Sequence, residues 1–525
     1  MQPGTPQGPN PVQAPVAMAQ TPMMMNIPQG MTLVTPEPVP LSPAPSNLQM
    51  ARPSRPWRMY GRIVLLVILL FFFETFLYYG WGWSIYGDPL FGSIALICSI
   101  PCMLGVIAMR RPRAVLLERA VPDSTGQQLH VITSHTGSLQ TPMPTRLDRH
   151  LMRDDSVLDV PSSSAAWIVF TVTVLCSVGL WYMLYVGDAI AQGVAVLLLI
   201  PTIIVGFSIP VMGWWSHSTK RIGLPTRRRD AEAWLIAGVL SAIPALFINS
   251  IIFVEIVYLF APDISMVNLE RLGACISAPV GEEICKAGAI WYFASKIKSP
   301  KHGFQIGFTV GLGFAILENL MYIIGTAGFP LNILVRGIGS IPGHAVWTGM
   351  TGASMGWVVM RKRANELQMA AEAGYQIKPP EKEDAQWKLV DKESGEVIET
   401  PGSNTESGVV VGPSGVEIWM PSAPILQKEP WIKIPLPQSI GIGLFFAMLG
   451  HASWNGILTI FEIFGEGSGL SELEFLVLYL FLIAMMIAAI WIIGTGLLHS
   501  VREAPDGGEV DEYQAQLAQL TQQRL

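Results

Sequence analysis

The sequence predicts an all-α polytopic membrane protein with about ten transmembrane helices. Half of its 525 residues are apolar and only 14% are charged, and the mean hydropathy is +0.42. Several apolar runs exceed 18 residues, the length that crosses about 30 Å of hydrocarbon as a helix. A soluble protein of this length would instead be expected to form several domains.

Ten spans can be placed near residues 62–84, 90–109, 165–186, 190–214, 233–260, 272–295, 303–325, 331–360, 437–462 and 473–499. Lysine and arginine gather after the second, fourth, sixth and eighth spans, whereas the opposite loops are acidic. By the positive-inside rule, ten spans with both termini in the cytoplasm satisfy every short loop. Arg271 and Arg336 fall near outer span ends, where we expect their long side chains to snorkel.

The segments between the spans differ in composition. Residues 1–58 are rich in Pro, Gln and Met, which predicts a disordered cytoplasmic tail. Within residues 364–435, the stretch 387–400 alternates around Ser394-Gly395 like a hairpin, so this insert is either a small β-rich appendage or a flexible loop. The other expected parts are a four-span N-terminal region at 59–232 with a cytoplasmic loop at 110–163, a helical bundle at 233–360 and 437–499 that carries the site, and a cytoplasmic tail at 500–525.

Three charged residues, Glu282, Glu283 and Lys286, interrupt the apolar run of the sixth span. A charge at the bilayer centre costs about 2.5–3.5 kcal/mol on insertion scales, so three in five residues require an explanation. Lys286 follows the two carboxylates by four and three residues, and on a helix it can face either of them. The group is either an ion pair that locks helix packing or a polar reaction centre, and the other spans decide between these.

Three further spans carry polar motifs: Glu318-Asn319, His344, and His451 followed one turn later by Asn455. Each alone has an ordinary explanation as a residue that hydrogen-bonds between packed helices. Measured from the cytoplasmic ends of their spans, however, these motifs and the acidic pair lie at one depth, roughly 21–24 Å at 1.5 Å per residue. Four polar motifs at one level on four consecutive spans are what a convergent site inside a bundle requires.

These residue types indicate the chemistry of such a site. Imidazole and carboxylate groups suit zinc, and a catalytic zinc usually keeps three protein ligands and one water. A bound metal lowers the pKa of that water, and a nearby glutamate can act as general base and acid. The chain has no His-Glu-x-x-His motif and no convincing serine nucleophile with a paired base. Glu74 and Glu255 lack a histidine at matching depth, and we interpret them as structural.

The chain resembles the PrsW family of intramembrane proteases over roughly 233–360 and 437–499. More distantly, it is similar to the CAAX-processing and bacteriocin-processing membrane proteases and to the anterior-pharynx-defective scaffold subunit of γ-secretase. The resemblance rests on four motifs in order, namely Glu282-Glu283-x-x-Lys286, Gly311-Leu-Gly-Phe-Ala-Ile-Leu-Glu318-Asn319, Arg336 ahead of Pro342-Gly-His344, and His451-Ala-Ser-Trp-Asn455. Together these motifs are specific, although each alone is not.

The resemblance implies a metal-dependent endopeptidase, with zinc as the cofactor, that cleaves a membrane-anchored regulatory protein in a bacterial plasma membrane. It implies that Glu282 and Glu283 activate water, and that Glu318, His344 and His451 hold a metal or stabilise the oxyanion. The remaining motif residues, implied to assist catalysis, are Lys286, Asn319 and Asn455. Related families are also argued to be glutamate proteases, whose histidines serve the oxyanion rather than a metal.

Two other classes of function stay open. A non-catalytic scaffold, like the γ-secretase subunit, could lose one carboxylate of the pair, but here both are present beside Lys286. A proton-coupled transporter could relay protons through a carboxylate–histidine centre, but the sequence shows no inverted internal repeat. The expected partners are the lipid bilayer and a membrane-anchored protein, and no nucleic acid.

Overall fold

The computed structural model describes residues 55–110, 158–224, 226–372 and 432–505, together with eight short strands. The chain divides into two units, of which one contains Glu118–Leu151 and the other contains the helices. Most of the predicted N-terminal tail, up to residue 54, lies outside the described residues, as do residues 506–525 of the predicted C-terminal tail.

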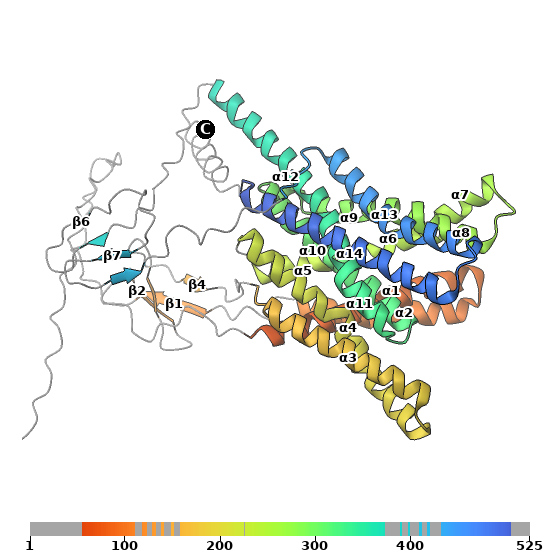
Figure 1. Ribbon diagram of the computed structural model, residues 1–525. Coiled ribbons are helices and arrows are strands. Elements are labelled where there is room, and N and C mark those ends of the chain that lie inside the picture. The colour runs from red at the N-terminus through yellow and green to blue at the C-terminus, as the bar shows by residue number, and fades with distance from the viewer. Residues whose placement is uncertain are drawn as a thin grey trace, which may run out of the picture. The chain divides into compact units, whose positions relative to one another are not determined.

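The helical unit confirms the predicted all-α polytopic membrane fold (Figure 1). Its α-helices are α1 Pro56–Tyr86, α2 Pro89–Arg110, α3 Ser163–Val186, α4 Ala189–Ile222, α5 Arg228–Leu240, α6 Ala242–Phe247, α7 Phe253–Phe260, α8 Met266–Leu272, α9 Ala278–Trp291, α10 Pro300–Gly325, α11 Pro330–Val335, α12 Ile341–Glu372, α13 Ile440–Gly467 and α14 Glu472–Glu503. Three π-helical turns lie between them, η1 Ile248–Ile252, η2 Gly273–Ser277 and η4 Arg336–Ser340, and a short 3₁₀ turn, η3, covers Ala294–Lys296.

Eight helical segments in the described part of the chain are long and apolar enough to cross a membrane. The two other predicted spans, 272–295 and 331–360, fall on α8–α9 and α11–α12. A π turn divides each of these pairs, and polar motif residues make them less apolar. A π turn often marks a functional site in a helix, so the two interrupted segments are where a site is expected.

Several helix ends follow from local sequence. The Asp188 side chain accepts the Ala191 N–H at the start of α4, and Ser299 caps α10, whose first residue is Pro300. Such caps satisfy backbone donors that the first turn leaves unpaired. At its other end, α4 stops at Gly223, which has a left-handed φ of 72°; this conformation favours glycine.

The outside of the helical bundle is apolar. Large side chains such as Leu197, Tyr182 and Phe481 are each at least 64% exposed. Water would solvate such a surface poorly, whereas lipid solvates it well, and the helices satisfy their own backbone hydrogen bonds. The protein is therefore an integral membrane protein.

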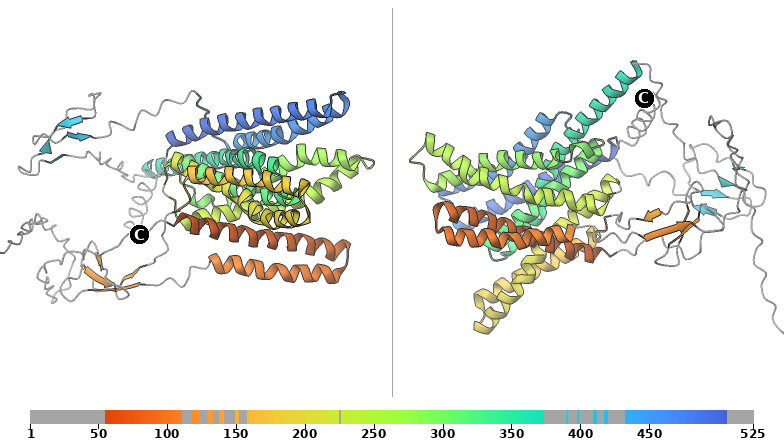
Figure 2. Two further views of the ribbon diagram at one scale, coloured as in Figure 1. Left: turned by 60° about the horizontal axis from the view of Figure 1, so that its bottom comes forward. Right: turned by 180° about the vertical axis from the view of Figure 1, so that it is seen from behind.

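Helix α10 lies at the centre of the bundle and packs against α12, α5 and α4. Figure 2 shows the bundle from two other sides. Three glycines on α10, Gly303, Gly307 and Gly311, lie so close to α12 that an added Cβ would overlap a carbonyl oxygen of that helix. This small-xxx-small spacing lets the two backbones approach closely, which brings the polar residues of α10 and α12 together.

The strands lie outside the membrane helices in sequence. Strands β1 Glu118–Pro122, β2 Leu129–Ile132, β3 Ser138–Gln140 and β4 Arg149–Leu151 form an antiparallel sheet in the order β3-β2-β1-β4, which the sequence analysis did not predict. In the insert, β5 Leu389–Val390 pairs antiparallel with β6 Val397–Ile398, with Leu389 opposite Ile398, which agrees with the β-rich alternative. Residues 391–396 between these strands, with Ser394-Gly395, lie outside the described residues. Strands β7 Val409–Val411 and β8 Glu417–Trp419 form a second hairpin.

Candidate functional site

The acidic pair and its lysine point into the bundle from α9. This helix begins just after the π turn η2, has Pro279 in its first turn, and packs against α5, α6, α10, α12 and α13. Lys286 is completely buried and Glu283 is 1% exposed, whereas Glu282 is 9% exposed. Because buried charges must be paired or coordinated, the surrounding helices have to supply partners.

Lys286 is the cationic centre of the cluster. Its Nζ donates to Glu283 Oε1 at 2.8 Å, lies 3.6 Å from Glu282 Oε2, and is 3.9 Å from the centroid of the Phe314 ring. The same Nζ is 2.8 Å from His344 Nδ1. An ammonium group can only donate, so Nδ1 of His344 is the acceptor and its proton belongs on Nε2.

The other face of His344 meets a carboxylate from α10. His344 Nε2 lies 2.8 Å from Glu318 Oε2, and Glu318 Oε1 lies 2.9 Å from an Arg336 guanidinium nitrogen. Arg336 Nε also donates to Asn319 Oδ1 at 2.7 Å, and the guanidinium stacks 3.9 Å from the Tyr322 ring centroid. The snorkelling interpretation of Arg336 was therefore wrong: the side chain turns inward because a carboxylate and an amide oxygen are there to receive it.

His451 completes the cluster from α13. Its Nδ1 lies 3.2 Å from Glu283 Oε1, its Nε2 lies 3.8 Å from Glu282 Oε2, and its ring stacks on Trp347 with 5.2 Å between centroids. Glu282 Oε2 is buried, and no hydrogen-bond partner reaches it in the part of the chain that the structure describes. Glu282 Oε2 thus lies in the interior within ion-pair distance of Lys286 and close to His451 Nε2, but without a hydrogen bond to any described residue.

Three of these residues could hold a metal ion. Glu282, His344 and His451 each offer one ligand atom, and the three atoms lie within 4.8 Å of one another. One carboxylate and two imidazoles are a known donor set for catalytic zinc. To bind a metal here, His344 would have to give up its contact with Lys286 or its contact with Glu318. The set differs from the expected one by having Glu282 in place of Glu318, whose two oxygens already lie close to Arg336 and His344.

The two asparagines of the motifs lie at the edge of this cluster. Asn319 accepts a hydrogen bond from Arg336 through Oδ1. Asn455 Nδ2 donates to the Ala274 carbonyl oxygen at 3.0 Å, which joins α13 to the π turn η2 ahead of α9. In this position Asn455 links two helices, and it contacts the backbone that presents the acidic pair rather than the carboxylates themselves.

Sequence reasoning missed four residues that support the site. The Thr348 hydroxyl donates to Glu283 Oε2 at 3.4 Å, and its place one turn after His344 on α12 was a usable signal. Trp347 packs on His451. The indole N–H groups of Trp214 and Trp491 donate to the carbonyl oxygens of Gly337 and Ile338, at 3.1 and 2.8 Å. No sequence signal marks these two tryptophans, because their acceptors exist only where the π turn η4 frees them.

Comparison with known proteins supports the resemblance. Residues 231–376 match the family described as "PrsW family intramembrane metalloprotease". The matched segment contains Glu282, Glu283, Glu318 and His344, whereas His451 on α13 lies beyond it. No curated protein and no solved structure matches the chain. The match confirms the resemblance to the PrsW family over residues 231–376, and it supports an intramembrane protease.

Proposed function

We propose, from the PrsW-type segment at residues 231–376, that this protein is a metal-dependent intramembrane endopeptidase that cleaves a membrane-anchored protein with glutamate-activated water. The observation that carries the proposal is the convergence of Glu282, Glu283, His344 and His451 in one buried cluster from three helices. Buried ionisable groups in a membrane are costly and mark functional sites. The cluster also leaves one buried carboxylate oxygen, Glu282 Oε2, without a hydrogen bond among the described residues, which helix packing alone would not require.

Glu282, His344 and His451 would hold the metal, which when bound supplies a water of lowered pKa. Glu283 would prepare His451 for this role. A proton on Nδ1 that donates to the Glu283 carboxylate would leave the lone pair of Nε2 to bind the metal. Such carboxylate–histidine pairs orient metal ligands in many sites. Glu283 is itself held by Lys286 and Thr348, so its charge and position are fixed.

The glutamate-only mechanism remains the second candidate because of one contact. Lys286 Nζ lies 2.8 Å from His344 Nδ1 and occupies the lone pair of that nitrogen. In this mechanism Glu282 Oε2 would take the proton of the attacking water, and the two imidazoles would stabilise the oxyanion. The two mechanisms therefore assign Glu282 different roles, ligand in one and general base in the other.

Proteolysis can be tested in proteoliposomes that hold the full-length protein and a panel of single-span membrane proteins. Glu282→Gln, Glu283→Gln and His344→Ala should each reduce cleavage at least about 10²-fold, the range for loss of a general acid–base group. Glu255→Gln is the matched control, because Glu255 is an exposed acid on α7 outside the cluster. Cleavage at the control rate by the folded cluster variants would contradict the proposal.

We also propose that the protein lies in a bacterial plasma membrane with both termini in the cytoplasm. The charge asymmetry of the loops supports this orientation. Under it, the sheet within residues 110–163 and the hairpins within 364–435 are cytoplasmic appendages of the N-terminal region and of the protease bundle. Single cysteines placed before residue 56 and after residue 505 should react with an impermeant thiol reagent only when the cytoplasmic face is open. Labelling of either cysteine from the outside of intact cells would overturn the orientation.

A further inference from the structure

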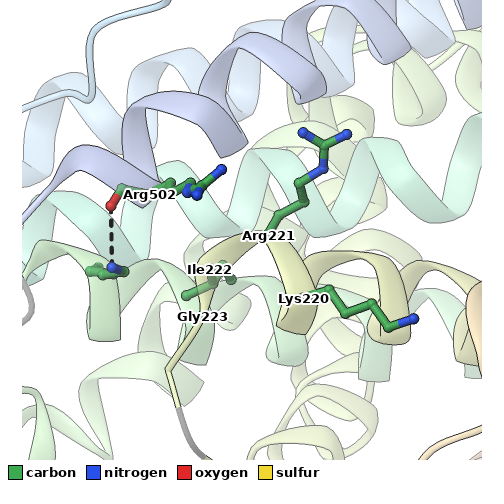
Figure 3. Close-up of a pocket in the computed structure, with 6 residues that line it drawn as sticks. Lys220, Arg221, Ile222, Gly223 and Arg502 are labelled. Carbon is green, nitrogen blue, oxygen red and sulfur yellow. Dashed lines mark hydrogen bonds between the residues drawn. The ribbon is translucent and has the colours of Figure 1, made fainter. Parts of the chain in front are cut away.

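A second polar feature lies away from the carboxylate–imidazole cluster, where α4 ends, α10 begins and α14 ends. A pocket of about 550 Å³ opens there. It is lined by Lys220, Arg221, Ile222, Gly223, Lys301 and Arg502. Figure 3 shows the Arg502 side chain pointing toward the end of α4 that carries Arg221. By the charge asymmetry of the loops, this is the predicted cytoplasmic side of the membrane.

Four of the six lining residues are cations, and no carboxylate is among them. They come from three helices that are distant in sequence. The nearest acid on α14, Glu503, instead faces Lys433 and His499. Figure 3 shows the Lys220 side chain pointing away from Arg502, so Arg221, Lys301 and Arg502 are the cations that matter, and none of the six lining residues is acidic.

Helix dipoles explain part of this charge but not all of it. Lys220, Arg221 and Arg502 lie at helix C-termini, where cations are favourable. Lys301 lies in the first turn of α10, the positive end of a helix, where a cation is unfavourable. Its ammonium reaches across to the Arg502 carbonyl oxygen at 3.2 Å, which draws the two cationic residues together. An anion in the pocket would offset the unfavourable position of Lys301 and the repulsion between Lys301 and Arg502.

We propose that this pocket binds the phosphate group of an anionic membrane lipid. Basic pockets between transmembrane helices on the cytoplasmic side are suited to anionic headgroups, and arginine guanidinium groups match phosphate oxygens in pairs. The three helix ends place the pocket at headgroup depth. Its volume suits a headgroup with its glycerol unit better than a single inorganic ion.

The bound lipid would join three helices that also support the catalytic cluster. Trp214 on α4 and Trp491 on α14 hold the π turn that carries Arg336, and α10 carries its partner Glu318. A ligand across the ends of α4, α10 and α14 would stabilise this arrangement. The binding site itself does not depend on whether the protein is a protease.

Native mass spectrometry of the full-length protein in detergent tests the pocket directly. Phosphatidylglycerol and phosphatidylcholine are titrated separately into the wild-type protein and into the triple variant Arg221→Gln/Lys301→Gln/Arg502→Gln. The matched control is Arg58→Gln/Lys296→Gln/Lys362→Gln, which removes three exposed cations elsewhere on the predicted cytoplasmic side. Melting curves establish that all three proteins are folded, and Arg502→Gln alone replaces the triple variant if that variant unfolds.

Phosphatidylglycerol should bind the wild type and the control with the same affinity. It should bind the pocket variant at least about tenfold more weakly, since each cation near an anionic lipid contributes about fivefold in affinity. For Arg502→Gln alone the expected loss is about fivefold. Equal loss in variant and control, or equal binding of phosphatidylcholine, would overturn the proposal. Displacement of the lipid by millimolar inorganic phosphate would assign the pocket to a free phosphate anion and overturn the lipid assignment.

Discussion

Removal of the Lys286 ammonium should be among the most destabilising single changes in the chain. Lys286 is fully buried and donates to Glu283, which is itself only 1% exposed. Lys286→Met keeps most of the apolar stem of the side chain but leaves the Glu283 carboxylate buried without its cation. Loss of one partner of a buried ion pair costs about 3–5 kcal/mol. We expect the free energy of unfolding of Lys286→Met to fall by that amount.

A double-mutant cycle separates this effect from loss of packing. The proteins are wild type, Lys286→Met, Glu283→Gln and the double variant, and the measurement is reversible unfolding in mixed micelles. The double variant should be more stable than the sum of the single changes allows, with a coupling of about 1.5 kcal/mol or more. The control cycle uses the exposed pair Lys362 and Glu366, whose nitrogen and oxygen are 4.0 Å apart and whose coupling should stay below about 0.5 kcal/mol. Additive effects at Lys286 and Glu283, within the error of the control, would refute the reasoning.

Three further changes test how the site is held. Gly311→Ala, whose Cβ would overlap a carbonyl oxygen of α12, should lower the cleavage rate at least tenfold, whereas Gly325→Ala, which has open space around it, should not. Trp214→Phe loses the N–H that satisfies a buried carbonyl group of η4, so the free energy of unfolding should fall by about 1–3 kcal/mol. An unchanged free energy of unfolding would show that this hydrogen bond does not stabilise the π turn. Arg336→Lys keeps the charge but cannot reach both Glu318 and its neighbouring amide, so turnover in proteoliposomes should fall about tenfold or more, and wild-type turnover would contradict the role given to this residue.

Much of the helical architecture could be predicted from the sequence, because continuous apolar runs set the spans directly. The expected span 303–325 corresponds to α10 at Pro300–Gly325, and 473–499 to α14 at Glu472–Glu503. The equal depth of the polar motifs, counted in residues, also anticipated that α9, α10, α12 and α13 bring them together. The sheet at Glu118–Leu151 was missed, since its three- to five-residue strands carry too little alternation to stand out from a polar loop.

Other features of the site depend on contacts between side chains, which the depth of a residue along its helix does not determine. Glu282 and Glu318 lie at the same level, so depth could not decide which carboxylate faces both imidazoles. The arrangement depends on Arg336, which turns inward and, with His344, lies within 2.9 Å of the Glu318 oxygens. Glu282 is the carboxylate that groups with both imidazoles. The π turn that carries Arg336 has no sequence signature, and the tryptophans that support it were missed for the same reason.

Metal content, measured by elemental analysis of the purified detergent-solubilised protein, is the most direct test of the proposed metal centre. Wild type should carry about one zinc per chain, as a single catalytic site requires, and the folded double variant His344→Ala/His451→Ala should carry almost none. Glu282→Gln should lose more metal than Glu318→Gln if Glu282 is the carboxylate ligand. A wild-type protein without metal after chelator-free purification would contradict the metal centre and favour Glu282 as a general base.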